Sequence, residues 1–194
     1  EYGFWVWIDP HQDAWSRFTG GSGAPGWTLS VAGFDVRKLE ATGAAVVHQT
    51  HGDPFTHMLW PTNYTKLACA TMFMLFYGGK ELAARTCVKG ENIQEYLQRH
   101  YLAMMQRVVR RLSDLPHVIG YGVMNEPNMG WIGIDDLTTY KWELQLGPCC
   151  APLQSLALSN GLPQLVSTFD HGMLGFKNTG SVGLNPNCWR PWKD

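Results

Sequence analysis

The sequence predicts an α/β fold in which parallel strands alternate with helices. Residues 3–8 and 118–124 are short, continuous apolar runs, which are typical of strands buried on both faces of a parallel sheet. Between them, residues 92–113 repeat apolar side chains every three or four positions, as an amphipathic helix does. A strand, a connection that contains a helix and a second strand form a crossover unit, so the two strands should be parallel.

End signals support the helical predictions. Asn92 can cap the helix over 92–113, and Glu95 follows three residues later in a capping-box arrangement. A second helix is predicted from the spacing of the apolar residues between Leu67 and Leu75, and the pair Gly78–Gly79 should end it.

The other segments carry weaker patterns. Residues 16–30 are punctuated by Gly, Ser and Pro and should form a loop. Prolines also interrupt residues 131–194, where we expect a long loop region with one short helix near 135–144.

Composition narrows the class of protein. The 194 residues suffice for one domain with a sizeable core. The net charge of −1 gives no electrostatic reason to bind nucleic acid or an anionic membrane surface. No apolar run reaches the roughly 18 residues of a membrane span.

The cysteines match no zinc or redox spacing. We expect reduced thiols, with a disulfide between Cys69 and Cys87 as the alternative. Residues 63–65 also form a glycosylation sequon, a triplet that is common by chance.

Polar motifs follow both predicted strands. The sequence DPHQD, residues 9–13, ends the first apolar run, and NEP, residues 125–127, ends the second. Because the carboxyl ends of parallel strands lie at one edge of a sheet, the two motifs should meet there. That edge holds the active site in α/β folds.

Glu126 is a candidate general acid. Pro127 disfavours helical backbone at the residue before it, so Glu126 should stay extended at the mouth of the strand. Burial against aromatic walls would favour its neutral form, which a general acid needs near neutral pH. Asn125 offers a donor and an acceptor to a substrate hydroxyl. The alternative is that Glu126 caps a following helix or pairs with an arginine.

His11 and Asp13 alternate around Gln12, so an extended chain places them on one face. They could hydrogen-bond a polyol. With His51, Asp53 and His57 they could instead ligate a metal, although no spacing typical of a metal motif is present. A third interpretation is that these histidines lie in loops or at the rim of the site.

Several tryptophans lie next to polar or glycine-rich motifs and could stack on a sugar or on a flat apolar group, or else fill the core. They are Trp15, Trp27, Trp60 and Trp131.

Three motifs together resemble a known family. They are GFWVWIDPHQDAWSRFTGGSGAPGWTL at 3–29, NYTKLACATMFMLFYGGKELA at 63–83 and VIGYGVMNEPNMGWIG at 118–133. In this order they resemble glycoside hydrolase family 5, in its branch of endoglycoceramidases, fungal glucocerebrosidases and fungal sterylglucosidases. The likeness covers residues 1–135 and is weaker to 194.

The resemblance implies a (β/α)8 barrel, of which residues 1–194 would be part of the single catalytic domain, with the two predicted strands as the third and fourth. It implies a retaining β-glucosidase that acts on a steryl β-glucoside or glucosylceramide. Glu126 would be the acid/base, Asn125 would hold the 2-hydroxyl, and His11 and Asp13 would line the glucose subsite. From their positions beside these motifs, Trp15 and Trp131 are expected to contribute to the same substrate site.

The resemblance implies no metal or organic cofactor and no obligate protein partner. The partner would be the glycolipid substrate, with peripheral contact to a membrane, and a cytoplasmic or internal-membrane location is favoured over secretion.

A retaining mechanism needs a second carboxylate about 5–5.5 Å from the acid. In the family this nucleophile ends the seventh strand, and no segment here is suited to strands five to eight. A barrel of this type needs about 250 residues. We therefore expect an internal segment of a larger enzyme, inactive by itself, with its nucleophile outside the chain.

Among the carboxylates of this chain, Asp13 is the nearest replacement for the nucleophile by topology, but the family uses that position to bind sugar. A metal-dependent hydrolase and a non-catalytic glycan- or lipid-binding module stay open as alternatives.

Overall fold

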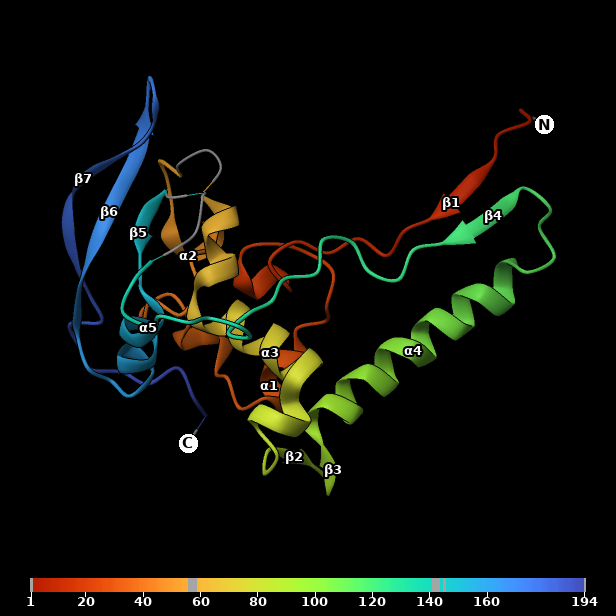
Figure 1. Ribbon diagram of the computed structural model, residues 1–194, viewed down its shortest axis with the longest axis horizontal. Helices are drawn as coiled ribbons and strands as arrows, with labels where there is room; N and C mark the ends of the chain where they lie inside the picture. Colours follow the sequence, from red (N-terminus) through yellow and green to blue (C-terminus); the bar gives the residue numbers. More distant parts are fainter. Residues whose placement is uncertain (1, 56–58, 141–143, 145, 194) are drawn as a thin grey trace.

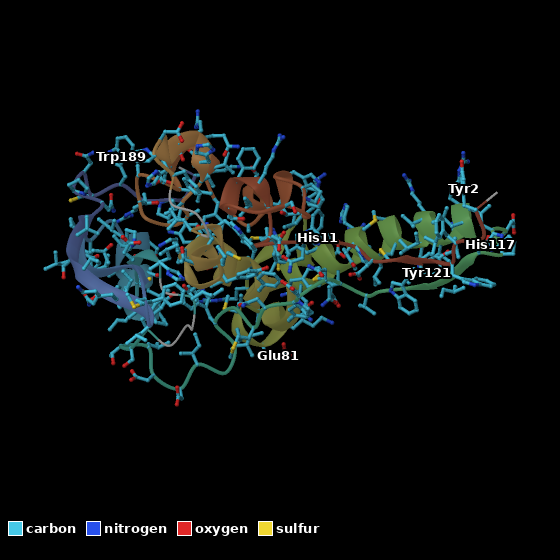
Figure 2. All side chains as sticks on the ribbon, turned by 90° about the horizontal axis from the view of Figure 1, so that it is seen from above. Tyr2, His11, Glu81, His117, Tyr121 and Trp189 are labelled. Carbon is cyan, nitrogen blue, oxygen red and sulfur yellow. The ribbon has the colours of Figure 1, made fainter. Side chains whose placement is uncertain are left out.

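The computed structural model describes residues 2–55, 59–140, 144 and 146–193, and it has a mixed α/β architecture (Figure 1). Two regions are distinguished below. The arm comprises residues 2–9 and 103–121, which extend away from the other described residues, the body. Figure 2 shows Tyr2, His117 and Tyr121 towards the far end of the arm, and His11 where the arm meets the body.

The two predicted strands pair in parallel in the arm, which confirms the prediction. β1 (Val6–Ile8) aligns with β4 (Val118–Tyr121), with Ile8 opposite Tyr121. Their predicted burial on both faces is wrong, because Trp7 is 60% exposed and Ile119 is 58% exposed. The described part of the sheet has only these two strands, so it offers few neighbours that could cover them.

Helix α4 (Ile93–Leu112) connects the body to the arm (Figure 1). Asn92 caps it, since its side chain accepts a hydrogen bond from the Gln94 N–H at 3.0 Å. The predicted capping box with Glu95 is wrong, because the Glu95 carboxylate instead forms an ion pair with Lys80 on α3 at 2.7 Å. The Tyr101 hydroxyl donates to the Val123 carbonyl and ties the helix to the segment after β4.

Helix α3 (Leu67–Leu82) is the centre of the body. It was predicted to end at Gly78–Gly79, but it continues to Leu82 with non-helical backbone at Gly78. A β-carbon at Gly79 would lie 3.0 Å from the Gln94 side chain. The glycine therefore serves the close approach of α3 to α4 rather than a helix end.

The core forms where the loops of the N-terminal half pack on α3. Its largest buried side chains include Leu29, Phe34, Phe73 and Ile93. Short helices shape these loops: η1 (Arg17–Thr19), α1 (Trp27–Val31), η2 (Val36–Lys38), α2 (His48–His51) and η3 (Trp60–Thr65). The segment 16–30, predicted to be loop, thus contains two short helical turns. A small hairpin, β2 (Cys87–Val88) with β3 (Glu91–Asn92), precedes α4.

The prediction of a long C-terminal loop is wrong. Strands β5 (Gly147–Cys149), β6 (Gln164–Gly172) and β7 (Gly175–Leu184) form an antiparallel sheet in that order, and α5 (Pro152–Ser159) packs beside it. The prolines fit this structure, because Pro148 lies on an edge strand and Pro152 starts a helix. Residues 135–140 form turns and bends rather than the predicted helix, and 141–143 lie outside the described residues.

All five cysteines are free thiols, so the alternative of a Cys69–Cys87 disulfide is wrong. Asn63 of the sequon is fully buried, and its side chain hydrogen-bonds the Val46 backbone, so it is not accessible for glycosylation. Among the described helices, none combines the length and apolar character that crossing a bilayer requires.

Candidate active site

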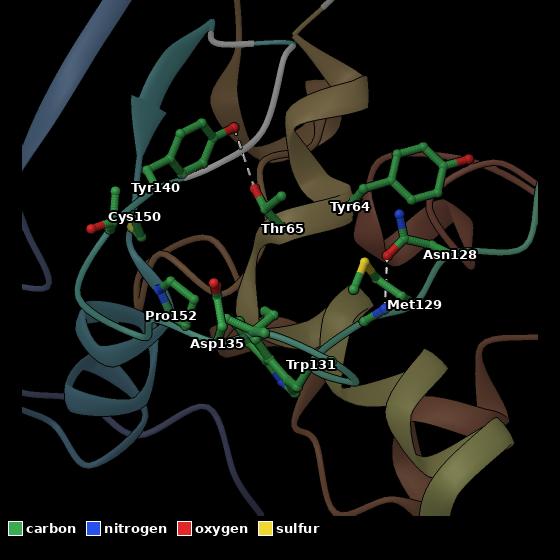
Figure 3. A pocket seen from close by; sticks show the side chains of 13 residues that line it. Tyr64, Thr65, Asn128, Met129, Trp131, Asp135, Tyr140, Cys150 and Pro152 are labelled. Carbon is green, nitrogen blue, oxygen red and sulfur yellow. Dashed lines mark hydrogen bonds between the residues drawn. The ribbon is translucent and has the colours of Figure 1, made fainter.

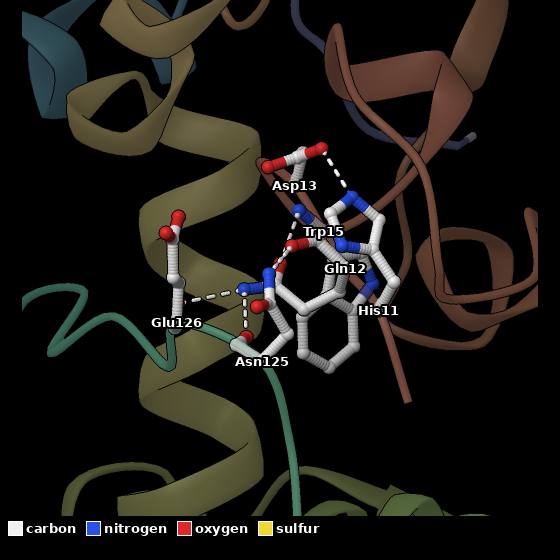
Figure 4. A network of polar contacts seen from close by, with 6 residues as sticks. All are labelled: His11, Gln12, Asp13, Trp15, Asn125 and Glu126. Atoms are coloured by element: carbon white, nitrogen blue, oxygen red, sulfur yellow. Dashed lines mark hydrogen bonds and ion pairs between the residues drawn. The ribbon is translucent and has the colours of Figure 1, made fainter. Parts of the chain in front are cut away.

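The two polar motifs meet where the arm joins the body, as the sequence predicts. The Gln12 side-chain nitrogen donates to the carbonyl of Asn125 at 2.8 Å and to that of Glu126 at 2.7 Å (Figure 4). In return, Asn125 Nδ2 donates to the Gln12 carbonyl at 3.0 Å. These bonds join residues more than one hundred positions apart in the chain, so they fix the relative position of the two strand ends.

Gln12 was not identified from the sequence. It is 5% exposed, and its Oε1 also accepts from the Trp15 N–H at 3.2 Å. The sequence did contain a signal for its position, because side chains alternate between the two faces of an extended segment. If His11 and Asp13 share one face, Gln12 must point the other way, which here is towards the second strand.

His11 and Asp13 share a face as predicted. Their side chains pair at 2.6 Å between Nε2 and Oδ2, and the imidazole is largely exposed. Backbone hydrogen bonds in both directions between Asp13 and Ser22 hold the motif against the glycine-rich loop. A β-carbon at Gly21 would lie only 1.7 Å from the Asp13 carbonyl oxygen, so this glycine is needed for the contact.

Glu126 differs from its prediction in two respects. Its φ of 41° lies in the left-handed region rather than the extended one, a conformation that costs a non-glycine residue roughly 1–2 kcal/mol. Pro127 disfavours the ordinary helical region at Glu126, and the bond from Gln12 holds the Glu126 carbonyl in place. Glu126 is also exposed among the described residues, so the predicted desolvation against aromatic walls is not present there.

Neither structural alternative for Glu126 is formed in the described part of the chain. No helix follows it between 127 and 140, and no described arginine forms an ion pair with it. Backbone strain of this kind gathers at functional sites, where the surrounding structure maintains it.

Tyr64 is a further residue beside the two motifs that the sequence did not single out. It is buried, and burial raises the pKa of its hydroxyl. The charges of Asp13 and Glu126 raise this pKa further, while a hydrogen bond with the Ala14 backbone lowers it. Tyr64 is therefore a neutral hydroxyl near both carboxylates at neutral pH. No local pattern indicates this position, because its two carboxylate neighbours come from distant segments of the chain.

The relatives of this chain decide its family. No protein-family model matches it. It is 47% identical to the glucosylceramidase of Rhizopus delemar over 173 residues, 87% of this chain and 25% of that protein. The ergosteryl-beta-glucosidase of Saccharomyces cerevisiae is 39% identical over 213 residues, 99% of this chain and 28% of that protein.

The crystal structure of Cryptococcus neoformans sterylglucosidase 1 with tris has a TM-score of 0.91 at 37% identity, over 99% of this chain and 29% of that one. The chain belongs to the fungal glucosylceramidase and sterylglucosidase branch of glycoside hydrolase family 5. It spans about a quarter of the length of the curated relatives.

The two tryptophans that were expected at the substrate site, Trp15 and Trp131, lie in different environments. Trp15 is 3% exposed, packs edge-on against Phe73 and Phe76, and donates to Thr28. It therefore belongs to the core, and it also contributes to the wall of the larger of the two cavities described next. Trp131 is partly buried, and its indole N–H donates to Thr71 at 3.0 Å.

Two cavities flank the junction between the DPHQD segment and residues 125–126. One of about 170 Å³ lies beside Tyr64 and the turn after Glu126, and its walls include Met129 and Trp131 (Figure 3). The other, of about 310 Å³, lies between the DPHQD segment and helix α4. Its walls are mainly apolar and include Trp15, Phe76, Leu97, Met104 and Met124.

The alternative of a metal centre finds no support in the described residues of the chain. No group of three or more His, Cys, Asp or Glu side chains gathers among them. His11 pairs with Asp13, and Asp53 pairs separately with His48 at 2.9 Å. His57, the remaining candidate ligand, lies outside the described residues.

Proposed function

We propose that the protein is a retaining β-glucosidase that releases glucose from a lipid aglycone, a steryl β-glucoside or glucosylceramide. The observation that carries the proposal is the junction at Gln12, which places Asn125 and Glu126 beside His11 and Asp13. Relatives named glucosylceramidase and ergosteryl-beta-glucosidase support the same activity.

In this proposal the chain contributes to one (β/α)8 catalytic domain, with β1 and β4 as its third and fourth strands. Their parallel pairing and the helix α4 between them support the assignment. The proposed site lies at the carboxyl ends of these strands, where barrel enzymes hold their catalytic residues.

Glu126 is the proposed acid/base. It protonates the glycosidic oxygen as the lipid leaves, and later takes a proton from the water that releases glucose. The nucleophile is a second carboxylate at about 5–5.5 Å in such enzymes, and we propose that it lies outside this chain. Asp13 is less suited to that role, because its Oδ2 is paired with His11.

The neighbours of Glu126 have proposed roles in binding. Asn125 Nδ2 is bonded to Gln12, which leaves Oδ1 to accept from the sugar 2-hydroxyl. His11 and Asp13 together present donors and acceptors to further hydroxyls of glucose. Trp131 contributes a wall of the smaller cavity, on the side of the chain that follows Glu126.

Glu126→Gln in the full-length protein tests the proposal. It removes the transferable proton at nearly constant size, so turnover of a steryl β-glucoside should fall by roughly 10²–10⁴-fold. Glu81→Gln, an exposed residue near the end of α3, is the matched control and should keep wild-type turnover. Near-wild-type turnover of Glu126→Gln would overturn the assignment.

A second measurement separates the acid/base from other roles. With a 4-nitrophenyl β-glucoside, whose leaving group needs little protonation, Glu126→Ala should accumulate the glucosyl-enzyme. Added azide should then restore turnover and give β-glucosyl azide, because the anion needs no general base. An α-configured product would contradict the retaining mechanism. Saturable glycolipid binding without any product in the wild type would indicate a non-catalytic module.

A further inference from the structure

Tyr64 lies against both polar motifs of the candidate active site, although neither motif is near it in the sequence. Its ring borders the smaller cavity together with the turn that follows Glu126. Figure 3 shows the hydroxyl pointing away from Tyr140 on the opposite side of that cavity. The hydroxyl instead forms a hydrogen bond with the backbone of Ala14, the residue that follows Asp13. The phenol therefore connects the end of the DPHQD segment to the cavity beside the turn after Glu126.

The position of Tyr64 is determined by contacts within this chain. The residue is 7% exposed, and any further part of a longer protein could only increase that burial. Its ring lies 6.3 Å from the ring of Phe73 in the core. The side chain of the preceding Asn63 accepts from the Val46 N–H and donates to the Val46 carbonyl, which holds η3 in place. A side chain held in this way can position its neighbours.

The backbone next to this phenol is strained on the DPHQD side. Ala14 and Trp15 have φ angles of 42° and 73°, in the left-handed region that bulky side chains rarely adopt. The Thr19 hydroxyl donates to the Ala14 carbonyl at 2.6 Å, and the Gln12 side chain accepts from the Trp15 N–H. Left-handed backbone thus occurs on both sides of the phenol, at Ala14 and at Glu126, as it does at functional sites.

The charges around the hydroxyl favour its acting as a donor. The titratable groups on the elements packed around it are Asp13 and His11 of the DPHQD segment, Glu126, Cys69 of α3, and Asp135 and Tyr140 across the cavity. Complete burial raises the pKa of the Cys69 thiol well above its usual value, so the thiol is neutral. Burial also raises the pKa of the Tyr64 phenol, which therefore has a proton to donate at neutral pH. A hydrogen bond from such a donor stabilises an ionised carboxylate.

We propose that Tyr64 is a positioning residue for the acid/base: its buried hydroxyl donates to the Glu126 carboxylate and favours the ionised form. The inference rests on the proposed function for its catalytic meaning. A retaining enzyme needs the protonated acid in its first step and the ionised base in its second. A neutral phenol supports the ionised form less strongly than a lysine or arginine would, so the carboxyl can still take up the proton that the first step requires.

Tyr64→Phe in the full-length protein removes the hydroxyl and keeps the ring. The basic limb of the kcat/KM profile for an aryl β-glucoside reports the ionisation of the acid/base. It should move up by about one pH unit, because the ionised carboxylate loses a hydrogen bond. The acid limb, which reports the nucleophile, should not move. Tyr77→Phe is the matched control and should keep the wild-type profile, because Tyr77 also packs on Phe73 but donates to Met124.

A measurement without substrate separates this inference from the proposed function. A water-soluble carbodiimide reacts with protonated carboxyl groups, and peptide mass spectrometry gives the pH of half-maximal labelling at Glu126 and at Asp13. In Tyr64→Phe this pH should rise at Glu126 by about one unit, while thermal melts match the wild type. If the wild type hydrolyses no glucoside, the proposed function fails, and the labelling still decides the role of Tyr64. An unmoved basic limb, an unchanged labelling pH at Glu126, or a shift at Asp13 alone would overturn the inference.

Discussion

The body and the arm are both rich in apolar side chains, yet they bury them to very different extents. In the body, Phe73 is fully buried and packs against Trp15. In the arm, Phe4 is 74% exposed and Trp5 is 67% exposed. The contrast shows that an apolar pattern reports which side chains are suited to burial, whereas burial itself depends on the layers packed against them. The candidate active site lies where these two regions meet.

The largest effect on stability is expected in a comparison of two phenylalanines, one from each region. In the 194-residue chain, Phe73→Ala should lower the free energy of unfolding by about 3–5 kcal/mol, because it leaves a cavity in the core. Phe4→Ala should change it by less than about 0.5 kcal/mol, since an exposed ring loses few contacts. Urea unfolding followed by tryptophan fluorescence measures both. Equal losses would mean that the arm is packed as tightly as the body.

The next comparison is between two glycines. Gly21→Ala should destabilise the chain by about 1–3 kcal/mol, since its new methyl group would overlap the Asp13 carbonyl and displace the DPHQD segment. Gly183→Ala on β7 has open space around its β-carbon and should be nearly neutral. Thermal melts of the two variants compare them directly. A neutral Gly21→Ala would show that the glycine-rich loop does not determine the position of Asp13.

Gln12 tests the connection between the arm and the body. Gln12→Ala leaves the carbonyls of Asn125 and Glu126 without their donor, which should cost about 1–2 kcal/mol. In the full-length protein it should also lower kcat, because the strained backbone of Glu126 loses a support. Gln106→Ala, at an exposed position of α4, is the control and should change neither quantity. Unchanged amide hydrogen exchange around Glu126 in Gln12→Ala would contradict this role.

The local patterns of the sequence were sufficient to predict the parallel pair, helix α4 and the meeting of the two polar motifs. Short apolar runs, a helical period and the crossover rule depend on nearby residues and on general topology. The C-terminal sheet was missed because β7 carries Gly175, Gly180 and Gly183, which weaken the strand pattern, and because Pro148 lies on its edge strand.

The details of the site were less predictable because they depend on contacts between distant segments. The positive φ of Glu126 is maintained by a bond from the distant Gln12, and the neighbouring Pro127 alone only disfavours the ordinary helical region. Tyr64 lies near both carboxylates only because η3 and the DPHQD segment come together in the fold. The catalytic and binding roles of Glu126, Asn125, His11 and Asp13 stay predictions.

The smallest effect concerns how the body responds to acid. The Arg37 side chain and backbone N–H donate to Asp35 and lower the pKa of its carboxyl from 3.8 to about 2. A pKa that is lower in the folded than in the unfolded state contributes stability above 3.8, and this contribution is lost as the pH falls towards about 2. Asp35→Asn should therefore lose less stability than the wild type between pH 4 and pH 2, as urea midpoints along that range would measure. Arg37→Gln should give a similarly flat response, because it removes the main cause of the lowered pKa. If both variants follow the wild-type curve, the pair does not contribute to the acid response of the body.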